Sequence, residues 1–337
     1  MNSLDGIIRA VQAQGSTLRV AIAPCAERFV LRAALNAAEL GLARPVFIGH
    51  RERACAAAQD ICPNFADYEF IDCPDDHEAV HRAVDLYRAG EVQLIMKGLV
   101  STATLLKAVL AKDAGLVAPG GILSLVSAFD APNQQEQSGE PRLMLLTDAG
   151  VNIRPNLQRK MDILKNALGV ARALGIVRPR VAVLAATEKV NFPAMPATLD
   201  ADLLSKMAAD GTFGDALVAG PLALDLAVSP VSARLKGVDN PVAGHADILL
   251  APDIESGNIL HKAIGVLLNA PIASVVVGSK VPVVVPSRGD SERSKLASIA
   301  LAVFLAQHAA SNLPGQHANS HVAAPALPQN NPQGATE

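Results

Sequence analysis

Four short polar strings in the sequence contain residue types that hold anions. Each follows an apolar run typical of a β-strand, and each precedes or enters a stretch with helical spacing. Open α/β sheets place their chemistry at such strand ends, so we expect these strings to supply the functional site. They are MKGLVST at 96–102, TDAGVN at 147–152, APDIESGNILHK at 251–262 and PSRGDS at 286–291.

The first and last strings carry the strongest anion donors. Lys97 follows a buried strand, and Ser101 stands at the start of a helix, where free N–H groups attract negative charge. Arg288 offers a planar, bidentate fork beside the hydroxyl of Ser287. A plainer alternative exists for two of these positions, because Ser101 and Asp290 are also suited to capping a helix.

The two middle strings combine carboxylates with amides and a lysine. Asp148 and Asn152 end a strand, where a hinge between domains is the alternative interpretation. After the next strand, Asn258 falls in the first turn of a helix and Lys262 in the second. A helix start with these side chains is a further place for an anion.

The string HEAVH at 77–81 fits H-E-x-x-H, which places two imidazoles one helical turn apart for zinc. Val84 occupies the glycine position of the extended motif, and no third ligand is evident, so we expect no metal. We interpret this segment as a helix between two strands, with Val80, Ala83, Val84 and Tyr87 facing the core. Neither G-x-x-x-x-G-K-[ST] nor G-x-G-x-x-G after a strand is present, which disfavours an ordinary ATPase or Rossmann dehydrogenase.

Composition narrows the class of protein further. The 337 residues are 50% hydrophobic and 18% charged, enough for two packed domains. A net charge of −3 argues against a protein that coats nucleic acid or an anionic membrane. No apolar stretch approaches the roughly 18 residues of a membrane span. The start of the chain lacks the basic and apolar regions of a signal peptide, so we expect a cytoplasmic protein whose four cysteines are reduced core residues.

Short β-branched runs alternate with longer helical patterns along the chain. Residues 18–23 and 45–48 are typical of strands and flank a helix at 26–42, which is a βαβ unit. The predicted strands are almost wholly apolar, which favours parallel strands covered by helices on both faces.

The same alternation divides the chain into an α/β fold of two α/β domains. Strands at 275–277 and 283–285 are expected to close the second sheet, and a last helix at 292–307 to return to the first domain. From 311 the chain is too poor in large apolar groups to offset its ordering entropy. The expected division is 1–150 plus 287–310 for a discontinuous first domain, 151–286 for the second domain and 311–337 for a disordered tail.

Over roughly residues 15–308, these strings resemble the phosphate acetyl/butyryltransferase family. The resemblance rests on MKGLVSTATLLKAVL at 96–110, TDAGVN at 147–152, PVAGHADILLAPDIESGNILHK at 241–262 and SRGDS at 287–291, with Gly220-Pro221-Leu222 and Asp225 as a further block. It implies two domains of the isocitrate/isopropylmalate-dehydrogenase-like type with a cleft between them, usually in a homodimer. It also implies reversible transfer of a short-chain acyl group from acyl-CoA to inorganic phosphate, without a metal or other cofactor.

The resemblance assigns roles to the last string. Arg288 is expected to hold phosphate and the developing oxyanion, and Ser287 to donate a hydrogen bond to the departing sulfur in a direct transfer. Asp290 is the candidate base. The residues expected to bind substrate are Lys97, Ser101, Lys107, Asp148, Asn152, Asp253, Gly257, Asn258, Lys262 and Ser294.

Departures from the family pattern favour the butyryl-type branch. Acetyl-type members carry a carboxylate seven positions after the serine, where this chain has Ser294, and an arginine where it has Lys107. Two alternatives remain open: an NAD(P)- and metal-dependent dehydrogenase of the same fold, and a non-catalytic metabolite-binding protein. The dehydrogenase would need a carboxylate cluster for its metal, and none is evident.

Overall fold

The computed structural model describes residues 1–131 and 142–311. Its strands are β1 (Arg19–Ala23), β2 (Arg44–Gly49), β3 (Phe70–Asp72), β4 (Leu94–Lys97), β5 (Ser124–Ala131), β6 (Arg142–Thr147), β7 (Arg180–Leu184), β8 (Leu217–Leu222), β9 (Ile248–Leu250), β10 (Ile272–Val277) and β11 (Val283–Val284). Its helices are α1 (Leu4–Gln14), α2 (Arg28–Glu39), α3 (Arg51–Ala58), α4 (Asp76–Arg88), α5 (Thr102–Val109), α6 (Leu157–Ala173), α7 (Pro196–Ala209), α8 (Leu224–Val228), α9 (Pro230–Leu235), α10 (Ile254–Lys262) and α11 (Glu292–Ser311). A π-helical turn, Ala263–Leu267, continues α10.

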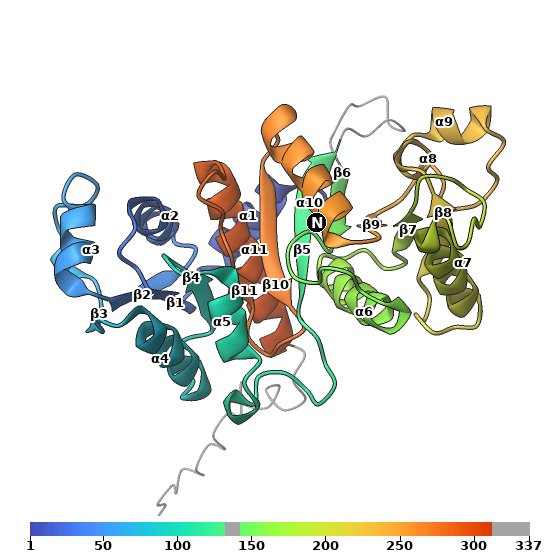
Figure 1. Ribbon diagram of the computed structural model, residues 1–337. Coiled ribbons are helices and arrows are strands. Elements are labelled where there is room, and N and C mark those ends of the chain that lie inside the picture. Colours follow the sequence, from blue (N-terminus) through green and yellow to red (C-terminus); the bar gives the residue numbers. More distant parts are fainter. Residues whose placement is uncertain (132–141, 312–337) are drawn as a thin grey trace, which may run out of the picture.

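One sheet runs through the whole described part of the chain. Its order is β3-β2-β1-β4-β11-β10-β5-β6-β9-β7-β8 (Figure 1). Strands β3, β2, β1, β4 and β11 are parallel, and so are β6, β9, β7 and β8. Between these groups, β10 is antiparallel to both β11 and β5, and β5 is antiparallel to β6. The α/β class is therefore confirmed.

The expected closing strands are placed differently from the prediction. β10 and β11 lie in the middle of the sheet, where β11 pairs with β4. Val283 lies opposite Ile95 in a parallel register, although some 188 residues separate them. Apolar periodicity carries no information on strand direction or on a distant partner, so an all-parallel arrangement was wrong at this point. The division into two domains stays a prediction, and the tail at 312–337 lies outside the described residues.

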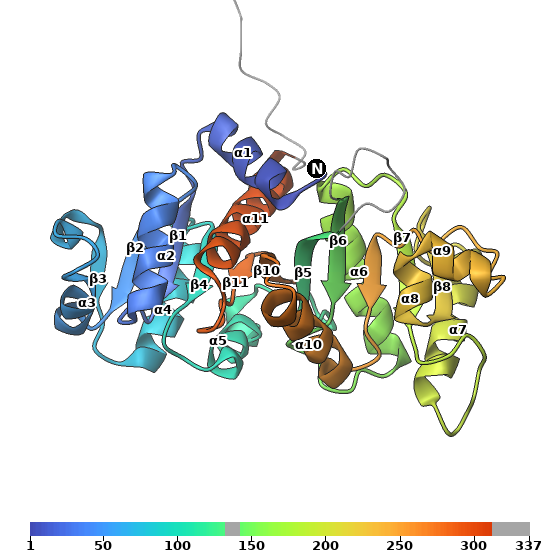
Figure 2. The same ribbon diagram turned by 90° about the horizontal axis from the view of Figure 1, so that it is seen from above.

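Helices cover both faces of the sheet, which explains why the strands are apolar throughout. Alternate residues of each strand enter two separate cores; in β1, for example, Ile22 faces one and Ala21 the other. Helices α1, α2, α6, α7 and α11 cover the first face, and α4, α5, α8 and α10 the second (Figure 2). α11 lies against α1, α2 and β10, so the last helix returns to the beginning of the chain.

Local sequence signals explain individual elements. In α4, Val80, Ala83 and Val84 are buried as predicted, while the partly exposed Tyr87 donates its hydroxyl to the Lys280 carbonyl at 2.8 Å. α1 was not predicted, although Ser3 caps its start and Gly15 ends it at φ 63°. The cysteine prediction is only half right: Cys25 and Cys73 are buried and Cys55 is exposed, and all four thiols are free.

Candidate active site

The strand order brings the first and last polar strings to one edge of the sheet. β1, β4 and β11 are parallel neighbours, with Ala23 opposite Lys97 and Val284 opposite Met96. Their carboxyl ends therefore point the same way (Figure 1). The segments that follow them, 24–27, 97–101 and 285–290, converge at this edge.

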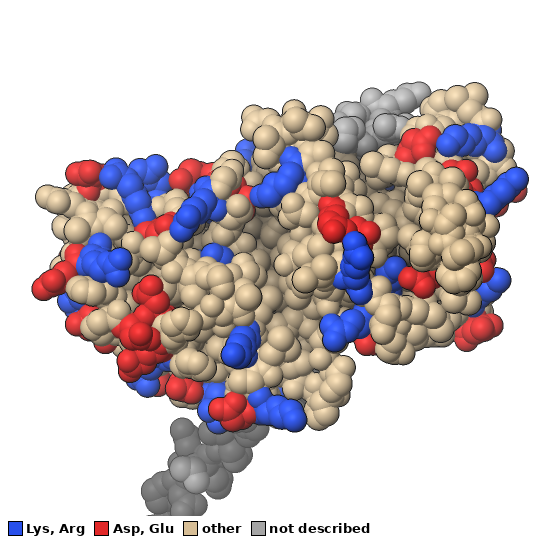
Figure 3. Space-filling view, viewed as in Figure 1, with Lys and Arg blue, Asp and Glu red and all other residues tan. Residues whose placement is uncertain are grey.

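These segments surround a hollow of about 400 Å³. Lys97, Ser101 and Arg288 all line it, so two cations and a hydroxyl predicted from separate strings do meet. Its remaining lining residues are Phe29, Gly98, Leu99, Val100 and Thr102. Figure 3 shows blue lysine and arginine side chains around the hollowed middle of the face that carries α5 and α10. The arrangement suits a small anion at the edge of the sheet.

Lys97 is held by its own loop. Its Nζ donates to the carbonyls of Gly98 at 3.1 Å and Val100 at 3.0 Å. Burial lowers the pKa of Lys97, opposed by the nearby Glu27 carboxylate. Gly98 has to be glycine, because a Cβ there would lie 1.7 Å from the Pro24 carbonyl oxygen. The backbone that carries Lys97 is thus fixed against the end of β1.

Ser101 is a helix cap as well as a lining residue. Its Oγ accepts the Thr104 N–H at 3.0 Å and lies 2.8 Å from the Thr104 hydroxyl. The capping alternative is therefore correct for this side chain, while its position at the start of α5 still borders the hollow. One residue serves both purposes.

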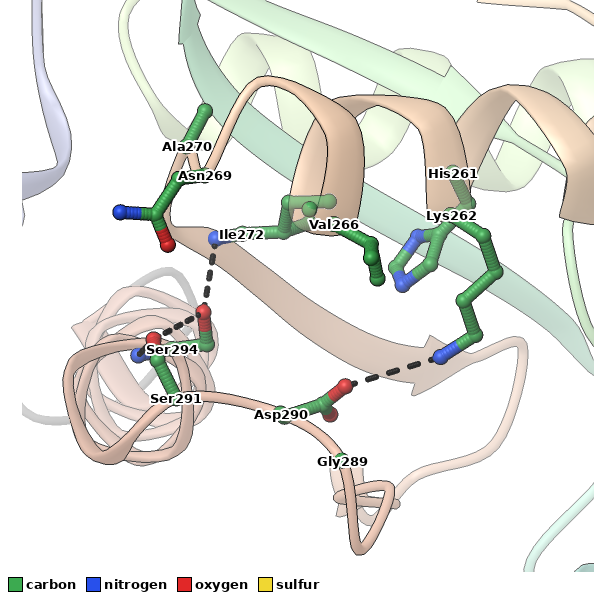
Figure 4. A pocket seen from close by; sticks show the side chains of 11 residues that line it. His261, Lys262, Val266, Asn269, Ala270, Ile272, Gly289, Asp290, Ser291 and Ser294 are labelled. Atoms are coloured by element: carbon green, nitrogen blue, oxygen red, sulfur yellow. Dashed lines mark hydrogen bonds and ion pairs between the residues drawn. The ribbon is translucent and has the colours of Figure 1, made fainter.

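Asp290 closes the turn that presents Ser287 and Arg288. One carboxylate oxygen accepts the Ser287 N–H at 2.8 Å, and the other lies 3.7 Å from Lys262 Nζ (Figure 4). The capping alternative for Asp290 was wrong, because it is Ser291 Oγ that accepts an N–H of the first turn of α11. With both oxygens engaged, Asp290 holds the turn; its role as a base stays a prediction.

The second string follows β6, which runs opposite to β11, although the register places Thr147 in the same row of the sheet as Val284 and Met96. The opposite direction results from the three antiparallel pairings between β11 and β6. Asp148 is buried and accepts three backbone N–H groups and the Asn152 amide, at 2.7–3.1 Å. Burial nevertheless raises the pKa of Asp148. Asn152 is also buried and donates to the Leu123 carbonyl, so both side chains organise the loop after β6.

α10 runs from the loop after β6 to the turn that contains Asp290. Asp253 caps its start by accepting the Ser256 N–H at 2.9 Å, and Asn258 donates to the Ala149 carbonyl at 3.1 Å. Gly257 allows the helix to approach closely, since a Cβ there would lie 2.5 Å from the Asp148 carbonyl oxygen. Lys262, at the far end of α10, pairs with Asp290 in the Ser287–Asp290 turn. The predicted residues thus form two groups, and among the described residues α10 joins them.

Two further predicted residues lie apart from the hollow. Lys107 is exposed on the last turn of α5, about 9 Å along the helix axis from Ser101. Ser294 is buried, accepts the Ile272 N–H at 3.1 Å and lies 2.9 Å from the Ser291 hydroxyl (Figure 4). Its hydroxyl therefore joins α11 to β10.

Sequence reasoning missed two residues of this site. Glu27 lies 3.3 Å from the Arg288 guanidinium, and Phe29 lines the hollow. Glu27 follows β1, so the strand-end rule that selected Lys97 applies to it as well, whereas Phe29 is an apolar residue of α2 and carries no such signal. The histidine of the third string, His261, has its Nδ1 3.2 Å from the Ser127 hydroxyl. Burial lowers the pKa of His261.

The HEAVH helix carries its polar residues on the solvent side. His77, Glu78 and His81 are exposed on α4, whereas Val80 and Ala83 enter the core. Within residues 1–131 and 142–311, no group of three or more His, Cys, Asp or Glu side chains is arranged to hold a metal ion. In the same residues, no helix is both long and apolar enough to cross a membrane.

Comparison with known proteins places the chain in a family. A family model described as "Phosphate acetyl/butaryl transferase" matches residues 75–303. A phosphate butyryltransferase from Clostridium acetobutylicum is 39% identical, over 91% of this chain and 99% of the relative. A phosphate acetyltransferase from Thermotoga maritima is also 39% identical, over 87% of this chain and 97% of the relative. The chain belongs to the phosphate acetyl/butyryl transferase family and is an acyltransferase.

Solved structures agree with this assignment. A branched-chain phosphotransacylase from Enterococcus faecalis superposes with a TM-score of 0.75 at 32% identity, covering 87% of this chain and all (100%) of that one. A 4-hydroxythreonine-4-phosphate dehydrogenase from Klebsiella pneumoniae gives a TM-score of 0.51 at 15% identity, covering 87% and 100%. The second match shows the fold alone, which the two kinds of enzyme share. The dehydrogenase alternative gains no support from it.

Proposed function

We propose that this enzyme transfers a short-chain acyl group between coenzyme A and inorganic phosphate, by direct transfer in a ternary complex. The observation that carries the proposal is the convergence of Lys97, Ser101 and Arg288 on one hollow, beside the turn that holds Ser287. Two cations at a partly enclosed edge suit phosphate. The relatives named for acetyl and butyryl transfer support the same chemistry.

Each residue has a defined task in this reaction. A phosphate oxygen attacks the thioester carbonyl, the carbonyl oxygen gains negative charge, and the C–S bond then breaks with its electrons passing to sulfur. Arg288 binds phosphate and stabilises the oxyanion, and Lys97 adds a second positive charge. Ser287 donates its hydroxyl proton in a hydrogen bond to the departing sulfur. A thiol with a reference pKa of about 8.5 leaves without needing full protonation.

The test is release of free thiol from acyl-CoA, followed with and without phosphate. We expect phosphate-dependent release with acetyl-CoA or butyryl-CoA in the presence of EDTA, and a series of acyl-CoAs of increasing length defines the preferred chain. Arg288→Lys keeps the charge and loses the planar fork, so turnover should fall by about 100-fold or more. NAD(P)H formation that requires a divalent metal would instead support the dehydrogenase.

The assembly and location of the enzyme are proposals of the same kind. We propose a homodimer, and exposed apolar side chains at Ile259, Leu267 and Leu268 near α10 are consistent with a surface that a second copy covers. Light scattering at several protein concentrations tests the stoichiometry. A cytoplasmic location is tested by cell fractionation.

A further inference from the structure

Glu27 occupies an unusual position for its residue type. It is the N-cap residue of α2, yet its side chain makes no capping hydrogen bond. Ser, Thr, Asp and Asn are the residues that cap well, because their short side chains reach the first free N–H groups. The Glu27 carboxylate turns instead toward the end of β11, where its Oε1 lies 3.3 Å from Arg288 Nη2. The element that carries Glu27 therefore gains nothing from it as a cap.

The two partners of this ion pair differ greatly in exposure. The Glu27 side chain is 17% exposed, whereas that of Arg288 is 72% exposed. The second carboxylate oxygen, Oε2, is buried and has no hydrogen-bond partner among the described residues. Burial of a carboxylate oxygen without a partner costs stability. A surface ion pair adds little stability in return, so folding alone does not account for a glutamate here.

An exposed arginine needs a fixed partner if it is to bind a ligand quickly and in one orientation. A free Arg side chain has about 2 kcal/mol of rotamer entropy, part of which is lost on binding. Glu27 is fixed by burial beside β1, and it engages only one Nη2 edge of the guanidinium. The remaining N–H donors stay available on the side of Arg288 that lines the hollow.

We propose that Glu27 is a positioning residue that orients the Arg288 guanidinium over the hollow for phosphate. The inference rests on the proposed function, because it assumes that Arg288 binds phosphate. The positioning role makes a different prediction from the charge of Glu27 alone. A carboxylate beside Lys97 and Arg288 repels phosphate, so removal of its charge would tighten phosphate binding if charge alone mattered. Orientation predicts the opposite, because an arginine that is displaced by about 1 Å loses catalytic efficiency.

Glu27→Gln separates these two effects, since it keeps the shape and removes the charge. We expect kcat/KM for phosphate to fall by about 10- to 100-fold, while the thermal midpoint stays close to that of the unmodified enzyme. Asp60→Asn is the matched control, because it breaks the exposed pair at 3.2 Å between Asp60, which follows α3, and Arg28, the first residue of α2, and activity should not change. If the Gln variant does not fold, Glu27→Asp shortens the reach by one methylene and carries the same expectation.

A double-mutant cycle with Arg288→Lys completes the test. If Glu27 acts through the guanidinium fork, Glu27→Gln should cost less than about threefold once Arg288 is already Lys. Equal losses in both backgrounds, or tighter phosphate binding in Glu27→Gln, would overturn the positioning role. An Arg288→Lys variant with normal turnover would instead overturn the proposed function, so the two failures are distinguishable.

Discussion

The Ser287 hydroxyl can act as a hydrogen-bond donor without a neighbouring base that removes its proton. The backbone N–H of Ser287 donates to Asp290, and among the described residues its hydroxyl makes no hydrogen bond to a histidine, the Nδ1 of His261 lying 3.2 Å from Ser127. A serine nucleophile needs an adjacent base to remove its proton. The geometry around Ser287 therefore favours a hydrogen-bond donor to the leaving sulfur over an acyl-serine intermediate.

The corresponding prediction concerns Ser287→Ala. We expect turnover to fall by about 100- to 1,000-fold, with phosphate-dependent activity still measurable and the phosphate KM little changed, because one hydrogen bond to the leaving group is lost. Initial rates at varied acyl-CoA and phosphate should give intersecting double-reciprocal lines. Parallel lines, or an acyl group trapped on Ser287 after quenching without phosphate, would show a covalent route.

At the scale of elements, two loops that follow neighbouring strands are locked together. The Lys97 loop fits against the end of β1 only because Gly98 has no side chain, with the Pro24 carbonyl oxygen 1.7 Å from where a Cβ would stand. Both partners are backbone, so neither can yield by a rotamer change. The same contact that fixes Lys97 also fixes the segment leading to Glu27.

We therefore predict that Gly98→Ala destabilises the protein by about 1–3 kcal/mol or more and lowers activity, because the Lys97 loop has to move. Gly169→Ala is the matched control. Gly169 is exposed within α6 and a Cβ there meets nothing within 4 Å, so this change should stabilise the protein by about 0.5–1 kcal/mol. Denaturant unfolding of the two variants measures both changes in the free energy of unfolding. Equal midpoints for Gly98→Ala and the unmodified protein would contradict the close contact.

The elements also show what the sequence can and cannot predict. Local signals suffice for α4, whose buried face is read from the spacing of Val80, Ala83 and Val84. They fail for β11, whose partner β4 is remote in the chain, and for the opposed directions of β6 and β11. Hence Lys97 and Arg288 were correctly expected at strand ends, whereas the sequence could not predict that Asp148 follows a strand of opposite direction. The strand-end rule also applies to Glu27, but only the fold shows that its partner is Arg288, which is distant in sequence.

At the scale of the whole molecule, the beginning and end of the chain depend on each other. β11 covers the edge of β4, and α11 lies against α1, α2 and β10. A fragment that ends after β5 would leave these surfaces exposed. Apolar strands and helices without their partners do not offset the entropy of ordering them.

The strand register suggests how β10, β11 and α11 can be joined directly to a fragment that ends after β5. β5 and β10 are antiparallel, with Phe129 opposite Ile272, so residues 131 and 270 stand across from each other at the end of the pair. A two-residue Asn-Gly loop is suited to joining them as a hairpin. We predict that residues 1–131 joined in this way to 270–311 unfold cooperatively on heating, whereas 1–131 alone do not. Circular dichroism against temperature measures both. A cooperative transition in residues 1–131 alone would show that β10, β11 and α11 are dispensable to the first half of the chain.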